Sequence, residues 1–299
     1  MSFVHLRLHT QYSMLEGAIR TDDLFDRVKS LGMPAVAMTD TSNMFGAIDF
    51  HGNASKAGIK PIIGCEINYV PQGRLPLTGG GPKAFKLILL SKDFKGYQNL
   101  CEIVTRAYTE APVPQKGQPV GPKAVVDREL LEKYAEGLIV LAGCIRGEIP
   151  YLLHTGDEKA AGDALHWFKK RWGEDFYLEL VDSGVPEQAD VNSALYALGE
   201  RNGVKCVATT NCHYLDAKES EAHEVLMCIE QGRNLDIDRP RSLVPSEYYL
   251  KSSELMRERF EQYPGVCDET LAIAAKCNLV FPFKDAKGRT IYQLPNFRP

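Results

Sequence analysis

Seven short hydrophobic runs recur along the chain, and segments with helical periodicity separate most of them. Each run is rich in Val, Ile, Leu or Tyr and is bounded by polar or turn-forming residues, which is typical of β-strands. The runs are Phe3–Leu8, Pro34–Thr39, Pro61–Val70, Phe85–Leu90, Gly137–Ala142, Asp175–Val181 and Val204–Thr209. This alternation predicts a parallel sheet with helices outside it, either an open doubly wound sheet or a closed barrel.

The expected helices lie between these runs and after the last one. Those between the runs are Thr21–Gly32, Phe45–Lys56, Tyr97–Tyr108, Lys159–Trp172 and Pro186–Arg201. Asn202-Gly203 stops the fifth of them, as expected of a helix C-cap. Three more are expected after Asp216, namely Ala217–Gln231, a helix capped by Ser252, and Val266–Cys277. Pro- and Gly-rich sequence predicts loops over Pro71–Ala84 and Ala111–Lys123.

Composition excludes several classes of protein. With 44% hydrophobic and 25% charged residues, a chain of 299 residues has the composition of a globular protein with a sizeable core. A formal net charge of −4 gives no basic surface that would bind nucleic acid without sequence preference, so any contact with DNA is expected to be local or indirect. The eight cysteines form no C-x-x-C pair, and no apolar stretch is long enough to span a membrane. A cytoplasmic protein with reduced thiols and no membrane contact is therefore expected.

Residues able to bind a metal or a phosphate lie near the ends of the predicted strands. They are His9, Asp40, Glu66, Cys144 and His213. Ligands of α/β folds bind at the carboxyl ends of the strands, which places these side chains on one rim. The same rim carries four residues that ligate a cation poorly or not at all: Arg7, Thr41, Lys86 and Asn211.

Arg7 argues most directly against a metal on this rim. Side chains alternate along a strand, so Arg7 shares a face with His5 and His9. Two unit charges about 4 Å apart interact by roughly 4 kcal/mol at an effective dielectric constant near 20, and a divalent ion doubles that repulsion. A metal ion and the Arg7 guanidinium are therefore not expected to be neighbours.

Six ordered blocks of this sequence resemble a known family. They are Phe3–Gly17, Gly32–Gly46, Ala57–Glu66, Gly96–Leu100, Gly137–Glu148 and Val207–Tyr214. These blocks resemble the polymerase and histidinol phosphatase (PHP) domain, in the version found at the N terminus of bacterial replicative DNA polymerase III alpha subunits. The resemblance implies a distorted seven-stranded, TIM-like β/α barrel over residues 1–280. Residues 281–299 would then be a linker toward a polymerase palm, with its Mg, that this chain does not contain.

Active members of the PHP family hold three metal ions with nine residues, and the resemblance carries these positions onto this sequence. Five are retained as possible ligands: His9, Glu16, Glu66, Cys144 and His213. Arg7, Thr41, Lys86 and Asn211 occupy the other four. The resemblance therefore implies a degenerate site without catalytic residues.

We expect side-chain cations to occupy the place of the lost metals, because buried acids without partners would be costly. Arg7 and Lys86 would pair with Glu16, Asp40 or Glu66. Two alternatives stay open at this point. His9 and His213 could be hydrogen-bonded core residues and Cys144 a packed thiol, or the retained residues could hold a single Zn or Mn ion.

The leading hypothesis for function is a non-catalytic platform within a DNA-directed DNA polymerase. The resemblance implies that its partners are the polymerase palm, thumb and fingers, a proofreading exonuclease subunit, and DNA only through the full polymerase. A residual metal-dependent phosphoesterase or 3′–5′ exonuclease is the alternative, and a free-standing phosphatase of small molecules is a weaker third. Asp236 and Asp238, and the basic run Lys169–Arg171, are interpreted as solvated surface residues.

Overall fold

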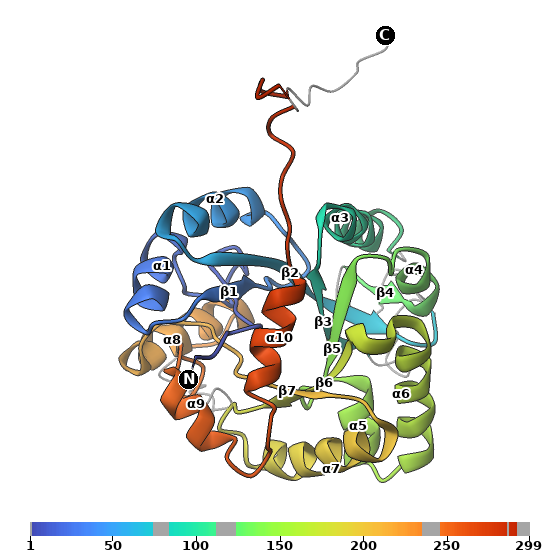
Figure 1. Ribbon diagram of the computed structural model, residues 1–299. Helices are drawn as coiled ribbons and strands as arrows, with labels where there is room; N and C mark the ends of the chain where they lie inside the picture. Colours follow the sequence, from blue (N-terminus) through green and yellow to red (C-terminus); the bar gives the residue numbers. More distant parts are fainter. Residues whose placement is uncertain (1, 74–83, 112–123, 235–245, 286, 292–299) are drawn as a thin grey trace.

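One curled sheet of seven strands forms the centre of the molecule (Figure 1). The computed structural model describes residues 2–73, 84–111, 124–234, 246–285 and 287–291. Along the sheet the strand order is β1-β2-β3-β5-β6-β7, with β4 beside β2. The strands are β1 (Ala35–Met38), β2 (Lys60–Val70), β3 (Phe85–Ser91), β4 (Val126–Asp127), β5 (Leu138–Ala142), β6 (Phe176–Val181) and β7 (Cys206–Thr209).

The prediction of an all-parallel sheet is wrong at β3. This strand runs antiparallel to both β2 and β5, with Glu66 opposite Ile88 and Leu141 opposite Ile88 on the other side. A parallel neighbour needs a long crossover, usually a helix. The sequence between β2 and β3 instead contains Gly79-Gly80-Gly81-Pro82, which does not favour a helix. The other strand pairs are parallel, as predicted.

The predicted first strand is an irregular segment that joins the two edges of the sheet. On one side it bridges β1, where the amide of Ala37 donates to the carbonyl of His5 at 2.9 Å. On the other side it bridges the chain just after β7, where the amide of His9 donates to the carbonyl of Cys212 at 2.8 Å. The curled sheet is thereby closed into the distorted barrel that the family resemblance implied.

Helices surround this barrel on the outside (Figure 1). They are α1 (Thr21–Ser30), α2 (Ala47–Ala57), α3 (Phe94–Thr109), α4 (Arg128–Lys133), α5 (Glu148–His154), α6 (Glu158–Trp172), α7 (Pro186–Asn202), α8 (Ser220–Gln231), α9 (Ser253–Arg259) and α10 (Asp268–Lys276), with short 3₁₀ turns η1 (Gly173–Asp175) and η2 (Ala217–Glu219). The sequence analysis missed two of the short helices, α4 and α5. The Ser252 cap is confirmed, because its hydroxyl accepts a hydrogen bond from the Leu255 amide.

Helix α10 covers one end of the barrel, and the view in Figure 1 looks onto that end. Ile273 and Ala274 of α10 pack into the inner core with the inward-facing residues of the strands. Lys60, at the start of β2, donates to the Ala274 carbonyl at 2.6 Å. This is the end at which the parallel strands begin, so their carboxyl ends open on the opposite side.

Candidate functional site

A cavity of about 420 Å³ lies at the carboxyl ends of the parallel strands. Eight of the nine positions that the family resemblance singled out line it: Arg7, His9, Glu16, Glu66, Lys86, Cys144, Asn211 and His213. Thr41, the ninth, donates its hydroxyl to the carboxylate of Glu16 at 2.6 Å. The structure therefore brings together side chains that are far apart in the sequence.

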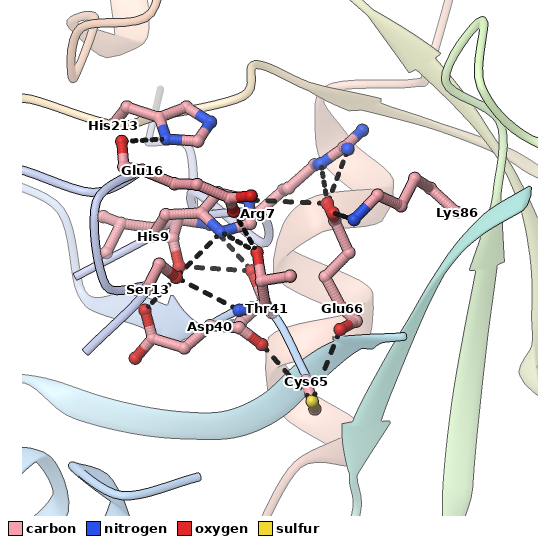
Figure 2. A network of polar contacts seen from close by, with 12 residues as sticks. Arg7, His9, Ser13, Glu16, Asp40, Thr41, Cys65, Glu66, Lys86 and His213 are labelled. Carbon is pink, nitrogen blue, oxygen red and sulfur yellow. Dashed lines mark hydrogen bonds and ion pairs between the residues drawn. The ribbon is translucent and has the colours of Figure 1, made fainter. Parts of the chain in front are cut away.

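Glu66 is the centre of the site, and two cations hold it (Figure 2). The Arg7 guanidinium donates from Nη2 and Nε to Oε2 of Glu66, at 2.6 and 3.1 Å. Lys86 Nζ lies 2.9 Å from the other oxygen, Oε1. Both oxygens of this buried carboxylate are thus paired with fixed positive charges.

The electrostatics of Glu66 follow from this pairing. Burial alone would raise the pKa of its carboxyl group, but Lys86 and Arg7 hold that pKa well below its ordinary value. Burial likewise opposes the charge on Lys86, but attraction to Glu66 outweighs it and raises the pKa of the ammonium group. All three groups are therefore charged at neutral pH.

Arg7 also contacts a second buried acid, which the sequence analysis missed. Its Nη1 lies 3.5 Å from Oε2 of Glu179 on β6, and the Thr209 hydroxyl of β7 donates to the other oxygen of Glu179 at 2.6 Å. An acid within the apolar run Phe176–Val181 was the available signal, because an acid buried in a strand needs a partner. Arg7 therefore links three parts of the barrel: its own segment, β2 and β6.

Asp40 was one of three acids expected to pair with Arg7 or Lys86, but hydrogen-bond donors hold it instead. Its carboxylate accepts hydrogen bonds from the Thr10 amide at 2.6 Å, the Thr10 hydroxyl at 2.7 Å and the Ser13 hydroxyl at 2.6 Å. Within the described part of the chain, neither Arg7 nor Lys86 forms an ion pair with it. Burial raises the pKa of Asp40, although these hydrogen bonds oppose the shift. Its role is to hold the loop that follows the first segment.

Three histidines pack against one another beside Glu66. The rings of His9 and His213 stack with centroids 4.3 Å apart, and the ring of His223 lies 5.2 Å from that of His213. His213 Nδ1 and His223 Nε2 lie 2.9 and 2.8 Å from the backbone carbonyl of Glu16. Burial lowers the pKa of His213 well below its ordinary value. Burial also lowers the pKa of His223, and the three histidines together form a buried layer of packed rings.

The sequence analysis missed two ring-bearing residues of the site. His223 lies on α8 and Tyr248 in the segment before α9, and both line the cavity. The Tyr248 ring lies 5.3 Å from that of His213. No pattern around either residue distinguishes it from a surface residue of a helix or loop.

The residues around Glu66 do not fit a multinuclear metal cluster. Within the described ranges no group of three or more His, Cys, Asp or Glu side chains is arranged to hold an ion. Both oxygens of Glu66 are engaged by cations, and the Cys144 thiol interacts with Arg7. A cluster of divalent ions needs several carboxylates to offset mutual repulsion, whereas this site already contains two positive side chains.

The basic run of α6 lies outside this site. Lys169 and Arg171 of α6 donate to the backbone carbonyls of Asn202 and Glu132, so they tie α6 to its neighbours. Asp236 and Asp238 fall outside the described residues. None of the described helices is both long and apolar enough to cross a bilayer.

Comparison with known proteins agrees with this geometry. The family model of the PHP domain matches residues 5–183. The chain is 38% identical over 299 residues to a DNA polymerase III subunit alpha of Treponema pallidum, and 37% identical over 313 residues to an error-prone DNA polymerase of Symbiobacterium thermophilum. These alignments cover 99% of this chain but 25% and 27% of the relatives, so the chain spans about a quarter of their length.

The fold has a similar solved structure. A putative metal-dependent phosphoesterase of Bifidobacterium adolescentis superimposes with a TM-score of 0.50 at 12% sequence identity, covering 71% of this chain and 88% of that one. At this identity the similarity concerns the fold alone, and it supports the distorted barrel. The match of the family model over more than half of the sequence shows that this chain belongs to the PHP domain family.

Proposed function

We propose that this chain is the PHP portion of a bacterial replicative DNA polymerase alpha polypeptide, and that it acts as a structural platform without phosphoesterase activity. The observation that supports this proposal is the pairing of Glu66 with Arg7 and Lys86. Residues 1–280 would form the domain, and 281–299 would lead toward the polymerase palm. Such a protein would work in the cytoplasm.

Loss of phosphoesterase chemistry follows from the same pairing. Metal-dependent hydrolysis requires an ion that activates water and neutralises the charge developing on the phosphate. A guanidinium and an ammonium group compensate the charge of Glu66, but neither generates a hydroxide nucleophile. Arg7, Thr41, Lys86 and Asn211 are therefore proposed to be substituted ligand positions. His9, Glu16, Glu66, Cys144 and His213 are proposed to be retained ligand positions that now serve packing and hydrogen bonding.

Reversion of the substituted positions tests this proposal. The variant that combines Arg7→His, Thr41→His, Lys86→His and Asn211→Asp should bind manganese or zinc, whereas the parent and the four single variants should not. Metal content is measured by elemental analysis of protein purified without chelator. Two or three equivalents of metal in the parent, or equal binding by the parent and the quadruple variant, would contradict the proposal.

A residual single-metal phosphoesterase or 3′–5′ exonuclease is the second candidate. It is supported by His223 Nδ1, a buried ring nitrogen without a hydrogen-bond partner among the described residues, and by His9 Nε2, which lies 3.4 Å from the Glu66 carboxylate. One zinc or manganese ion per parent chain, with hydrolysis of a phosphodiester that a chelator abolishes, would favour this candidate over the platform.

The partners we propose are the other polymerase domains and a proofreading exonuclease subunit. Three exposed apolar side chains give the exonuclease a candidate surface: Met14, Leu15 and Phe45. They lie on two loops that are tied together, since Asn43 donates to the Tyr12 carbonyl at 2.9 Å. Replacing Met14 and Phe45 by Glu should weaken co-purification with the exonuclease, whereas Ile229→Glu, an exposed apolar control on α8, should not. Equal binding of the exonuclease by the parent, the Met14/Phe45 double variant and the Ile229→Glu control would exclude this surface.

A further inference from the structure

The segment after α10 leaves the barrel in Figure 1, but its first residues are anchored to the barrel. Phe281 is only 7% exposed. It lies edge-on to His51 of α2 and Tyr97 of α3, at centroid distances of 4.8 and 4.9 Å. The Leu279 carbonyl lies 3.2 Å from His51 Nε2. This aromatic anchor fixes where the segment leaves the barrel.

Beyond the anchor the chain bends and forms a short antiparallel hairpin. The amide of Phe283 donates to the carbonyl of Phe281 at 2.9 Å, which turns the chain at Pro282. The amide of Ile291 then donates to the carbonyl of Phe283 at 2.9 Å, and Lys284 bridges Thr290.

Asp285 organises the turn of this hairpin. Its carboxylate accepts from the amides of Lys287 and Arg289, both at 2.9 Å, and pairs with the Arg289 guanidinium at 2.7 Å. A tail without clear sequence periodicity therefore contains a hydrogen-bonded turn.

The hairpin leaves apolar side chains exposed to solvent. Phe283 is 52% exposed and Ile291 is 38% exposed, and the hydrogen bond between their backbones places them opposite each other. A single two-stranded hairpin is at best marginally stable in water, because it buries too little apolar surface. The hairpin therefore requires a covering surface to be well ordered.

We propose that the hairpin formed by residues 283–285 and 287–291 is a docking element between the barrel and another part of a longer polypeptide. This inference rests on the proposed function, since the relatives are about four times as long as the aligned chain. Between Phe283 and Ile291 the sequence carries three basic residues, Lys284, Lys287 and Arg289, and a single acid, Asp285. The occupant is therefore an apolar surface of the same polypeptide with acidic side chains at its edge. Phe281 acts as the rigid joint that fixes the hairpin relative to α2 and α3.

Hydrogen exchange of the complete polypeptide encoded by the gene, compared with the 299-residue chain, tests the proposal. The amides of Phe283 and Ile291 should exchange at least about tenfold more slowly in the complete polypeptide, because the covering surface suppresses local opening. Phe283→Ser should abolish this difference, and Phe281→Ala should reduce it by freeing the joint. Ile229→Ser, which removes an exposed apolar side chain elsewhere, should leave it unchanged.

The outcomes separate this inference from the proposed function. Primer extension by the complete polypeptide, combined with equal exchange in both proteins, would refute the docking element and leave the polymerase assignment standing. Protection of the hairpin in a complete polypeptide that does not extend a primer would support the docking element and refute the polymerase assignment. A reading frame that ends at Pro299 would refute the docking element, because no polypeptide would be present to cover the hairpin.

Discussion

Replacing Arg7 by Met tests the most consequential contact of the site. The variant keeps much of the side-chain volume but removes both hydrogen bonds to Glu66, at 2.6 and 3.1 Å, and the contact with Glu179 at 3.5 Å. Removing one partner of a buried ion pair typically costs about 3–5 kcal/mol, because the remaining charge loses its compensation. Lys86 still compensates one oxygen of Glu66, so we expect the loss to be near the lower limit, about 3 kcal/mol. The free energy of unfolding is measured by denaturant titration at pH 7.

A matched control separates burial from ion pairing itself. Arg106 on α3 pairs with Glu110 at the same 2.6 Å distance, but its side chain is 35% exposed. Exposed pairs contribute about 0–1 kcal/mol, so Arg106→Met should cost less than about 1 kcal/mol. Losses of similar size in the two variants would refute the argument that the Arg7 pair matters because it is buried.

A double-mutant cycle and a pH series test the partner. When Arg7→Met is combined with Glu66→Gln, the loss should be clearly smaller than the sum of the two single losses, because the unpaired charge is removed as well. The pKa of Glu66 is depressed in the folded parent, so its stabilising contribution is present above its unfolded pKa and is lost as pH falls through the folded pKa. The deficit of Arg7→Met should therefore narrow as the pH falls. Additive losses, or a deficit independent of pH down to acid unfolding, would refute the pairing.

Three further predictions concern other parts of the barrel. Burial raises the folded pKa of Asp40, so its contribution to stability should decline as the pH rises through that pKa. The Asp40→Asn variant should lose this pH dependence and should also weaken the hydrogen bonds with Thr10 and Ser13. Denaturation measured over a range of pH checks this, and an unchanged pH profile of the variant would contradict it. Gly143→Ala should destabilise the fold by more than about 2 kcal/mol, because the added Cβ would lie 1.9 Å from the Glu179 carbonyl oxygen. Thermal or denaturant unfolding measures this loss. A variant as stable as the parent would show that the chain after β5 approaches β6 less closely. Ser252→Ala should cost about 1 kcal/mol by removing the cap of α9, whereas Ser252→Asp should not, and equal losses would argue against the cap.

Strand positions were predictable because most strands of this barrel are buried apolar runs bounded by polar residues. The direction of β3 was not predictable, because strand periodicity is the same in both orientations. The one relevant signal was that the sequence between β2 and β3 does not favour a helix. The first segment was predicted as a strand because it is a short run rich in Val and Leu and bounded by polar residues. In the structure it hydrogen-bonds to β1 at His5 and to the chain after β7 at His9, so it closes the barrel without a continuous ladder.

Most of the candidate site was predictable from polar residues near strand ends, and the family positions added Glu16. Arg7, Glu66 and Lys86 stood out because charges at or near strand ends are informative. Sequence could not decide which acid the cations would choose, because Glu16, Asp40 and Glu66 all lie on the rim. In the structure Thr10 and Ser13 donate the hydrogen bonds that Asp40 accepts, whereas Glu66 on β2 lies between Arg7 and Lys86 and pairs with both. The hairpin after Phe281 also escaped prediction, because a turn organised by one Asp has no periodicity.

Under the proposed function, the position of Arg7 explains how the barrel persists without a metal cluster. A metal cluster would cross-link the strand ends through its ligands, and removing it would leave buried acids repelling one another. Arg7 restores both functions, since its guanidinium neutralises acids from β2 and β6 while its backbone carbonyl accepts from the amide of Cys212 after β7 at 3.3 Å. The segment that closes the barrel thus carries the charge that stabilises its open end. On this reasoning, reversion of Arg7 to His alone should destabilise the domain without creating a metal site, and only the fourfold reversion should recover stability when metal is added.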